Sequence, residues 1–450
     1  MEIGLDSLYS NSLADIIGSY SSEHVEGVRV DSPKDIRVLS LFSGAGGMDI
    51  GFEGGFICHR RSIAPHLPWI KAQLNENWVR VLPTRFEMIF ANDIFEGART
   101  SWRQYMSLYG RGHTPYHLDS IVTLVKRHYG GEQIFPEDVD LVIGGFPCQD
   151  FSVAGKRKGF SSTKGHDGKS HLEGDLPTEE TRGMLYYWMR EVISITKPKV
   201  FIAENVKGLV NLNDVKEIIR RDFAGSDGNG YIVLPPKVLH AGDYGVPESR
   251  ERVFFIGLRR SDLTPQALRA LESLDIPQEY NPYPEPTHAY PLDAYLGLEP
   301  YVSCQEIFAH LKEPDESADL SQQVYSCAKY MGAHCQGQKE INLRGLGPTI
   351  RSEHHGNIEY RRLSKENGGS YIDELDSGLI ERRLTPRECA LIQTFPPDYP
   401  FVSRALAPRK KFNVSSSAAY KVIGNAVPPV LAYHIARRLQ ELWDTYFYTR

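Results

Sequence analysis

The chain has 450 residues and a formal net charge of −6, with 41% hydrophobic and 24% charged residues. This composition is typical of a soluble globular protein of two or three domains, and the negative charge argues against a surface coated with phosphate-binding groups. We expect neither secretion nor membrane spanning, because the N-terminus lacks a signal-peptide pattern and no run of about 18 apolar residues occurs. The six cysteines form no Cys-x-x-Cys pair, so no disulfide framework or zinc site is suggested and a cytoplasmic location fits best.

Residues 1–35 are rich in Ser, Asp and Glu, and we expect them to form a loosely attached extension. The apolar run 36–42 predicts the first strand, the Ser-Gly-Ala-Gly-Gly segment 43–47 a loop, and residues 48–52 the start of a helix. Such a unit can cradle a nucleotide or cofactor, since glycines let a ligand approach the backbone and the helix offers free N–H groups. A plain tight turn is the alternative, and the glycine spacing disfavours a dinucleotide such as NAD.

A second strand is predicted over 86–91, after an insertion at 58–85 that we place above the sheet. This strand leads to Asp93, and an acid at the tip of the second strand is where α/β cofactor folds hold ribose hydroxyls. Capping of the helix expected over 94–105 is a compatible alternative. Asp119 is the next acid at a plausible strand tip, with an ordinary loop acid as the alternative.

The apolar run 139–143 and the Gly-Gly-Phe-Pro turn after it place Cys148 at the carboxyl edge of the predicted sheet. Open α/β sheets carry out their chemistry at this edge. A cysteine is more often a small buried hydrophobe, but here glycines and a proline leave little bulk to bury it, which favours a nucleophile. The long polar segment 153–181, with basic residues at 156–158, is interpreted as a lid that closes over a substrate.

A second apolar run, 200–203, ends at Glu204, so that a carboxylate would leave a strand close to the thiol. A cysteine nucleophile beside a carboxylic acid suits addition to an unsaturated ring in which a nitrogen is protonated as carbon is attacked. Cytosine is such a ring.

Helices predicted over 182–196 and 214–221 and strands over 231–239 and 252–258 continue the alternation. This pattern predicts an α/β fold with a doubly wound, mostly parallel sheet. From about residue 261 proline, tyrosine and glycine become frequent, which indicates a smaller second domain of irregular or β-rich build.

Later in the chain, helices are expected over 384–393 and 430–443. Three basic clusters also occur, at 361–362, 382–383 and 409–411. Such clusters more often form a solvated face than a nucleic-acid contact.

In this order the motifs resemble those of the C5-specific cytosine DNA methyltransferases of bacterial restriction–modification systems. The resemblance runs from Leu39 to about Ile435, with gaps at the insertions. Any one motif is common, but all of them in order are specific. They are the glycine loop 41–47, Pro-Cys-Gln at 147–149, Glu-Asn-Val at 204–206, Arg-Glu-Arg at 250–252, the helix 383–396 and Gly-Asn at 424–425.

The resemblance implies a Rossmann-like, S-adenosylmethionine-dependent methyltransferase fold with a small target-recognition domain. It divides the chain into an extension (1–35), a catalytic and cofactor-binding domain (36–264), a target-recognition domain (265–415) and a C-terminal segment (416–450) that returns to the catalytic domain. The residues implied to hold S-adenosylmethionine are Phe42, Gly44, Gly46, Gly47, Asp93 on the ribose, Asp119 near the adenine, and Asn425.

It also implies a mechanism on duplex DNA, in which the target cytosine is swung out of the stack. Cys148 would add to C6, Glu204 would protonate N3, Arg252 would bind O2, and Arg250 would contact substrate or support the loop. For both arginines a surface ion pair with Glu248 or Glu251 is the alternative. Lid residues expected to reach the DNA are Gln149, Ser152 and Lys156.

The sequence departs from the family pattern at two positions. Ser40 stands where many members carry Asp, with little effect expected, and Glu248 stands in place of a more usual Gln, which would add negative charge near DNA. Target recognition is expected from residues 265–382, where Thr349, Ile350 and Arg351 are candidate DNA contacts. Two adjacent histidines at 354 and 355 lack a third ligand, so we expect no metal site.

Three other readings remain. One is a tRNA cytosine-5 methyltransferase on the same scaffold, disfavoured by the long second domain and the absence of that subgroup's Cys-Phe-Thr tripeptide. The others are an NAD-linked oxidoreductase and a catalytically silent DNA-binding protein. We expect a monomeric enzyme that acts on double-stranded DNA, without membrane or metal, and protects host DNA from a cognate restriction endonuclease.

Overall fold

The computed structural model describes residues 13, 15–18, 34–147, 172–173, 176–177, 185–211, 215–228, 230–290, 297–352, 357–405 and 411–448. Cys148, Gln149, Ser152 and Lys156 lie outside these residues, as does most of the expected lid. The four described residues of the lid form β8 (Leu172–Glu173) and β9 (Leu176–Pro177), which pair with each other in antiparallel fashion.

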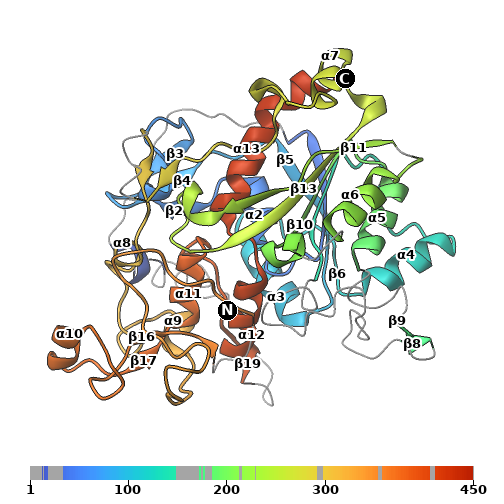
Figure 1. Ribbon diagram of the computed structural model, residues 1–450. Coiled ribbons are helices and arrows are strands. Elements are labelled where there is room, and N and C mark those ends of the chain that lie inside the picture. Colours follow the sequence, from blue (N-terminus) through green and yellow to red (C-terminus); the bar gives the residue numbers. More distant parts are fainter. Residues whose placement is uncertain are drawn as a thin grey trace.

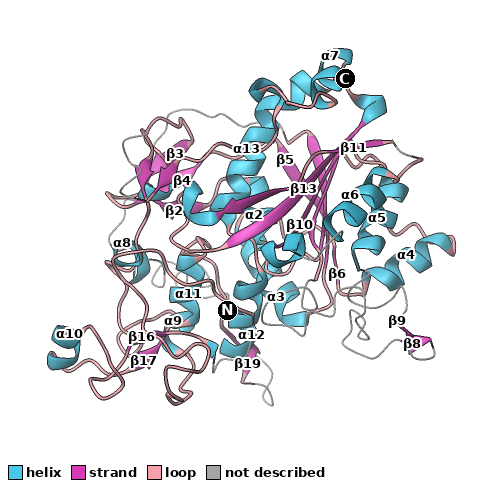
Figure 2. Cartoon of the chain, in the orientation of Figure 1, coloured by secondary structure: helices cyan, strands magenta, loops and turns pink. Residues whose placement is uncertain are grey.

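A central sheet with the strand order β11-β13-β10-β7-β1-β5-β6 runs through the molecule (Figures 1 and 2). The strands β6, β5, β1, β7 and β10 run parallel to one another. At the other side β13 is antiparallel to β10, and β11 and β12 are antiparallel to β13. The predicted mostly parallel α/β sheet is therefore confirmed. Its strands are β1 (Ile36–Leu41), β5 (Phe86–Asn92), β6 (Tyr116–His117), β7 (Leu141–Gly145), β10 (Val200–Val206), β11 (Tyr231–Val233), β12 (Lys237–His240) and β13 (Glu251–Arg259).

The prediction of a single strand over 231–239 is wrong, because β11 and β12 are separate strands on either side of Leu234-Pro235-Pro236. Proline has no N–H to give to a ladder, so two consecutive prolines interrupt the pairing.

Helices cover both faces of the sheet, and β1 shows why. Alternate side chains of a strand point to opposite faces. Val38 belongs to the core beneath one helical layer, whereas Leu39 and Leu41 belong to the core of the other. The first layer holds α2 (Gly47–Glu53), α3 (Glu96–Leu108), α12 (Ser416–Asn425) and α13 (Pro429–Tyr446), and the second holds α4 (Ile121–Tyr129), α5 (Leu185–Thr196) and α6 (Val215–Ala224).

The C-terminal helix α13 lies directly against α2, although the two are far apart in sequence (Figure 1). A Cβ on Gly51 of α2 would lie 2.5 Å from the Cβ of Ala432 and 2.6 Å from the carbonyl oxygen of Pro429. A side chain at position 51 would therefore force the helices apart. Gly51 therefore allows the C-terminal helix α13 to pack closely against α2.

The insertion after α2 forms a three-stranded antiparallel sheet of β2 (Ile57–His59), β4 (Trp78–Val81) and β3 (Ile70–Gln73). Trp69 packs edge-on against Tyr433 and His434 of α13, with ring centroids 5.4 and 4.9 Å apart. The insertion thus packs on the C-terminal helix.

Residues 13–18 correct the expectation of a loosely attached extension for this stretch. Ile16 and Ile17 are each 1% exposed. Asp15 accepts hydrogen bonds from the Lys312 ammonium and the Ala318 N–H, and Asn75 of the insertion donates to the Ile17 carbonyl at 2.8 Å. This segment therefore joins the insertion to the small region.

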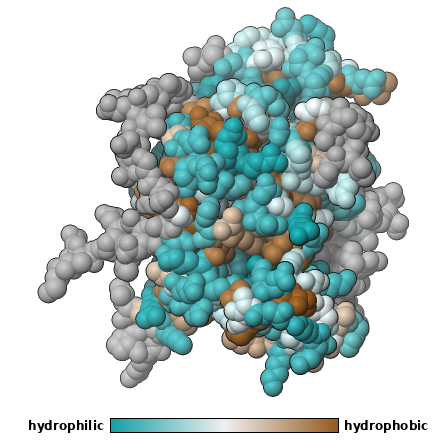
Figure 3. All heavy atoms as spheres, turned by 90° about the vertical axis from the view of Figure 1, so that its left-hand side faces the viewer, coloured by the Kyte–Doolittle hydropathy of each residue, from teal (hydrophilic) through white to brown (hydrophobic). Residues whose placement is uncertain are grey.

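The small region, residues 297–405, has only short regular elements, as predicted. Figure 3 views the side of the molecule that carries it and the insertion, and hydrophilic residues cover most of the coloured surface there. Among the described residues, no helix has the length and apolar character needed to cross a bilayer. The elements are β15 (Glu299–Pro300), α8 (Cys304–Ile307), α9 (Leu320–Gln323), β16 (Tyr360–Arg362), α10 (Ile372–Asp376), β17 (Arg382–Arg383), α11 (Pro386–Ile392) and β18 (Ser403–Arg404), followed by β19 (Phe412–Val414).

Between the sheet and the small region, residues 260–290 contain α7 (Pro265–Leu271), a 3-10 turn (Gln278–Tyr280) and β14 (His288–Ala289). Tyr446 of α13 donates to the Tyr280 carbonyl at 2.7 Å, and Tyr283 donates to the Phe254 carbonyl of β13 at 3.0 Å. The first part of the region expected to be the target-recognition domain thus packs on the catalytic half.

Candidate active site

The glycine loop after β1 is bent by left-handed backbone conformations. Phe42, Gly44 and Gly46 have φ values of 53°, 55° and 78°. A Cβ on Gly46 would lie 2.6 Å from the Trp102 ring, so only glycine fits there. At Gly44 a Cβ would have its nearest neighbour at 4.0 Å, so the space beside this residue is open to a ligand. The loop fits the expected role of a cofactor cradle.

Asp93 holds this loop at the tip of β5. One carboxylate oxygen accepts from the Gly44 N–H at 3.0 Å and the other from the Phe95 N–H at 2.9 Å. Burial raises the pKa of Asp93, against these bonds, which lower it. The N-cap of α3 is Phe95, so Asp93 is not the capping residue. Its expected contact with a ribose stays a prediction.

Asp49 in α2 is a buried acid that sequence reasoning missed. Its carboxylate accepts from the Ser40 hydroxyl at 2.6 Å and from the Trp102 indole N–H at 2.7 Å. Burial raises its pKa to about 6. Ser40, the departure from the family pattern, therefore supports the helix that follows the loop.

Two buried tyrosines also support the loop and were missed. Tyr116 donates to the Gly44 carbonyl at 3.0 Å and Tyr399 donates to the Ala45 carbonyl at 2.7 Å. Tyr399 comes from the Phe-Pro-Pro segment after α11, more than 350 residues away in sequence. No local pattern could have revealed that partnership.

Asp119 lies beyond β6, next to the tip of β5. Its backbone carbonyl accepts from the Asn92 amide at 2.8 Å, and its half-exposed carboxylate lies 3.9 Å from Arg127. The structure places it near the cofactor loop through these neighbours, and its role toward an adenine stays a prediction.

Glu204 lies near the end of β10, in register with Gly145 at the end of β7. A Cβ on Gly145 would lie 2.6 Å from a carboxylate oxygen of Glu204, so the glycine makes room for the acid. Arg252 on the adjacent strand β13 forms an ion pair with Glu204, with its Nε 2.9 Å from a carboxylate oxygen. Burial nevertheless raises the pKa of Glu204, with Arg252 and Arg250 opposing it. A carboxyl of this kind can hold a proton near neutral pH.

Asn205 links the end of β10 to the segment that carries the nucleophile. Its amide donates to the Phe146 carbonyl at 3.1 Å, and its side-chain oxygen accepts from the Val206 N–H at 2.8 Å. Phe146 is two residues before Cys148 in sequence. The motif Glu-Asn-Val was recognised from the sequence, but the positioning role of its asparagine was not.

Arg250 and Glu248 are both fully buried, which corrects two expectations. Their separation of 3.5 Å is inside the protein, so they form no surface ion pair. Glu248 accepts from the Ile350 N–H at 2.8 Å and therefore brings no charge to a DNA surface. Arg250 donates to the carbonyls of Ile350, Gly424 and Ala426 at 3.0, 2.9 and 2.8 Å.

The candidate recognition residues differ in their exposure. Thr349 is at the surface and donates to the Ser249 carbonyl. Ile350 is 0% exposed, so its side chain is part of the core and unavailable to DNA in this structure. Arg351 is partly exposed and donates to Glu359 at 2.7 Å. Thr349 and Arg351 stay candidates for DNA contact.

A profile of the C-5 cytosine-specific DNA methylases matches residues 36–441 of the chain. The chain belongs to this family. It is 30% identical to the Type II methyltransferase M.BspRI of Lysinibacillus sphaericus over 91% of this chain and 82% of the relative. It is 28% identical to M.BsuRI of Bacillus subtilis over 96% and 85%, respectively. Among solved structures, a DNMT2 variant from Spodoptera frugiperda is similar at a TM-score of 0.49 and 17% identity, covering 91% of this chain and all of that one.

The protein is therefore a DNA (cytosine-5-)-methyltransferase. Its family implies S-adenosylmethionine-dependent methylation of DNA. Asn425, expected at the cofactor site, is the exposed last residue of α12. Two residues later, the Val427 carbonyl oxygen would lie 2.2 Å from a Cβ on Gly47 at the start of α2. The C-terminal segment thus reaches the glycine loop of the methylase.

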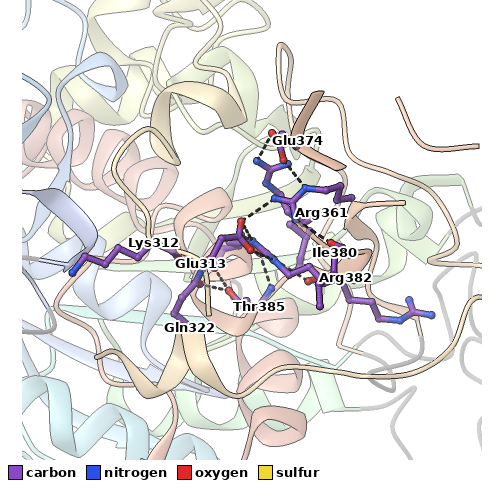
Figure 4. A network of polar contacts seen from close by, with 12 residues as sticks. Lys312, Glu313, Gln322, Arg361, Glu374, Ile380, Arg382 and Thr385 are labelled. Carbon is purple, nitrogen blue, oxygen red and sulfur yellow. Dashed lines mark hydrogen bonds and ion pairs between the residues drawn. The ribbon is translucent and has the colours of Figure 1, made fainter. Parts of the chain in front are cut away.

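Two of the predicted basic clusters are not surfaces of the methylase. Arg362, Arg382 and Arg383 are 0%, 4% and 1% exposed, so the expected solvated faces are wrong at these positions. Arg382 bonds to Glu313 at 2.7 Å and Glu388 at 2.8 Å, within the network shown in Figure 4. Their burial and ion pairs stabilise the small region.

Proposed function

We propose that the methylase acts on a cytosine swung out of duplex DNA within a short specific sequence, and that Glu204 and Arg252 carry the recognition of the ring. The observation that supports this most directly is the ion pair at 2.9 Å between the buried Glu204 and the partly exposed Arg252, beside Gly145. These groups lie at the carboxyl edge of the parallel strands, where α/β enzymes place their chemistry.

Cys148 is the proposed nucleophile. It follows Gly145, the last residue of β7, by three positions, and the Asn205–Phe146 bond fixes the intervening backbone. The Cys148 thiolate adds to C6 of the cytosine while Glu204 donates its proton to N3. The raised pKa of Glu204 supports this acid role, since an exposed carboxyl would be ionised at neutral pH.

Arg252 orients the Glu204 carboxyl and offers its remaining N–H groups to O2 of the ring. A planar guanidinium can contact both partners at once, because its five N–H groups fan out in a fixed plane. The addition of Cys148 makes C5 nucleophilic toward the methyl group that the cofactor would supply. Loss of the C5 proton to a water base, elimination of the Cys148 thiolate and return of the N3 proton to Glu204 would then restore the aromatic ring.

Residues that would hold S-adenosylmethionine are those of the glycine loop, with Asp93, Asp119 and Asn425 around it. When bound, the cofactor supplies the methyl group as an electrophile. The open space beside Gly44 and the left-handed backbone at Gly46 support a close approach of the ligand to the main chain. Asp93 is already bonded to the Gly44 N–H, so it fixes the loop before any ligand binds.

Protection of host DNA from a cognate restriction endonuclease is proposed from the similarity to Type II methyltransferases. The test is transfer of labelled methyl groups from S-adenosylmethionine to genomic DNA and, in a parallel reaction, to tRNA, followed by base-resolution mapping of 5-methylcytosine. We expect label at cytosines of one short motif with wild type and none with Cys148→Ala. Label on tRNA alone would replace the DNA assignment with the RNA one.

A further inference from the structure

Arg250 joins two segments that are distant in sequence. Its guanidinium donates to the Ile350 carbonyl, in the candidate recognition segment 349–351, and to the carbonyls of Gly424 and Ala426 at the end of α12. The side chain is fully buried, and four of its five N–H groups are on the two nitrogens that make these bonds. Its Nε is also buried, so none of its donors is directed to solvent.

The carbonyls of Gly424 and Ala426 are at a helix end, where the last backbone carbonyls lack donors within the helix. A positive charge is also favoured there by the helix dipole. Arg250 satisfies both requirements. The arrangement explains why an arginine is buried here with only one carboxylate, Glu248, 3.5 Å away.

The two segments are also in direct backbone contact. A Cβ on Gly424 would lie 2.2 Å from the carbonyl carbon of Arg351 and 2.4 Å from the Ser352 nitrogen. Any shift of the recognition segment toward DNA must therefore move the end of α12 or separate from it.

The same end of α12 leads to the glycine loop. The Val427 carbonyl oxygen would lie 2.2 Å from a Cβ on Gly47, the first residue of α2. A continuous set of packed contacts thus runs from Ile350 and Arg351, through Gly424 to Val427, to Gly47. Such packed contacts can carry coupling between two sites when an element between them has two arrangements.

We propose that Arg250 is a positioning residue that couples DNA engagement at segment 349–351 to cofactor binding at the glycine loop, and that it does not touch the flipped base. The assignment rests on the proposed function, because that function defines the two ligands. Arg252 differs from Arg250 in facing Glu204, so the two arginines of one motif have separate tasks.

The test measures the Kd of S-adenosylmethionine by calorimetry, with and without a duplex carrying the mapped motif, in the Cys148→Ala background so that no methyl group is transferred during the titration. The ratio of the two values is the coupling factor, which is typically about 5- to 150-fold where two sites are coupled. Wild-type Arg250 in this background is expected to show such a factor. Arg250→Lys keeps the charge but cannot reach three carbonyls, so we expect a factor near 1 and about tenfold weaker binding without DNA.

Arg252→Lys is the matched control, since the same change is made two residues away in the same motif. It is expected to lower kcat while leaving cofactor binding without DNA and the coupling factor as in wild type. If Arg250→Lys also lowers kcat only, with both binding values unchanged, Arg250 contacts the substrate and the proposal is wrong.

Glu248→Gln serves as a second variant in case Arg250→Lys does not fold. It keeps an acceptor for the Ile350 N–H but removes the charge beside Arg250. A smaller fall in the coupling factor is expected, and an unchanged factor in a variant with altered kcat would overturn the proposal. The wild-type methyl-transfer assay separates these outcomes, because its failure would refute the proposed function itself.

Discussion

The carboxyl edge of the central sheet and the small region use charged side chains in opposite ways. In the sheet, the strand ladder satisfies the backbone, and the charged groups at the strand ends, such as Glu204 and Arg252, pair with each other. In the small region the regular elements are short, and Arg383 donates to the carbonyls of Ala328, Lys329, Gly337 and Ile358. In the small region, the arginine side chain thus supplies hydrogen bonds to the backbone that strand pairing supplies in the sheet.

The difference follows from the cost of a buried backbone group without a partner. An irregular segment has many carbonyls that no neighbouring N–H can reach. An arginine can satisfy several of them at once, because its five donors fan out in a plane. A pair of arginines in a proline-rich, irregular region can thus be a sign of internal structure as much as of a DNA-binding surface.

The largest expected effect tests the sheet edge. Glu204→Gln keeps the size of the side chain but removes the proton donor, so kcat for methyl transfer is expected to fall about 10²- to 10⁴-fold. Glu251→Gln, the same change at a half-exposed neighbour paired with Lys207, is the control and should change kcat little. Comparable losses in both variants would contradict a special role for Glu204.

The next effect tests the small region. Arg382→Leu leaves the buried Glu388 carboxylate without its ion-pair partner, while the partly exposed Glu313 keeps Arg362. The free energy of unfolding should therefore fall by about 3–5 kcal/mol. Lys365→Leu removes an exposed pair with Asp376 and should cost less than about 1 kcal/mol. Urea unfolding measures both. Equal losses in the two variants would show that burial of the arginine network adds nothing to the free energy of unfolding.

A third prediction concerns pH and Asp49, whose pKa burial raises to about 6. Ionising this carboxyl costs more free energy in the folded than in the unfolded protein. Its contribution to the free energy of unfolding therefore falls as pH rises from about 4 to 6, and does not change further above pH 6. Asp49→Asn cannot ionise and should gain on wild type across that range by about 3 kcal/mol. Urea unfolding at pH 4, 5, 6 and 7 measures the difference, and a gap that does not grow with pH would refute the buried charge.

The smallest effect concerns the N-terminal segment. Asp15→Ala removes two hydrogen bonds to the small region, from Lys312 and Ala318, and should lower the free energy of unfolding by about 1–2 kcal/mol. Thermal unfolding with Asp373→Ala as an exposed acidic control would measure it. An unchanged Tm would support the original prediction that the segment is a loosely attached extension.

Much of the sheet could be predicted because its strands are apolar runs separated by glycine and proline. The same reasoning placed Glu204 at the sheet edge, since polar residues directly after such runs lie there, and Cys148, outside the described residues, stays a prediction. The break between β11 and β12 was missed although Pro235-Pro236 marks it. The pattern of apolar residues on both sides outweighed the prolines in the prediction.

Other features have no local signal. Tyr399 contacts the glycine loop, which lies hundreds of residues earlier in the sequence. Arg250 contacts Gly424, which lies well over a hundred residues later. The sequence shows neither that an arginine is buried nor that its partners are carbonyls. Ile16 and Ile17 are two apolar residues in a polar stretch, and only the structure shows the surface that covers them.

The packing of α13 on α2 also has a consequence for synthesis on the ribosome. The first strand, loop and helix emerge early, but the helix that covers them begins about 380 residues later. At 5–20 residues per second, a nascent chain would keep that apolar face uncovered for roughly 20 to 80 seconds. Until α13 has been synthesised, this apolar face is open to non-native association.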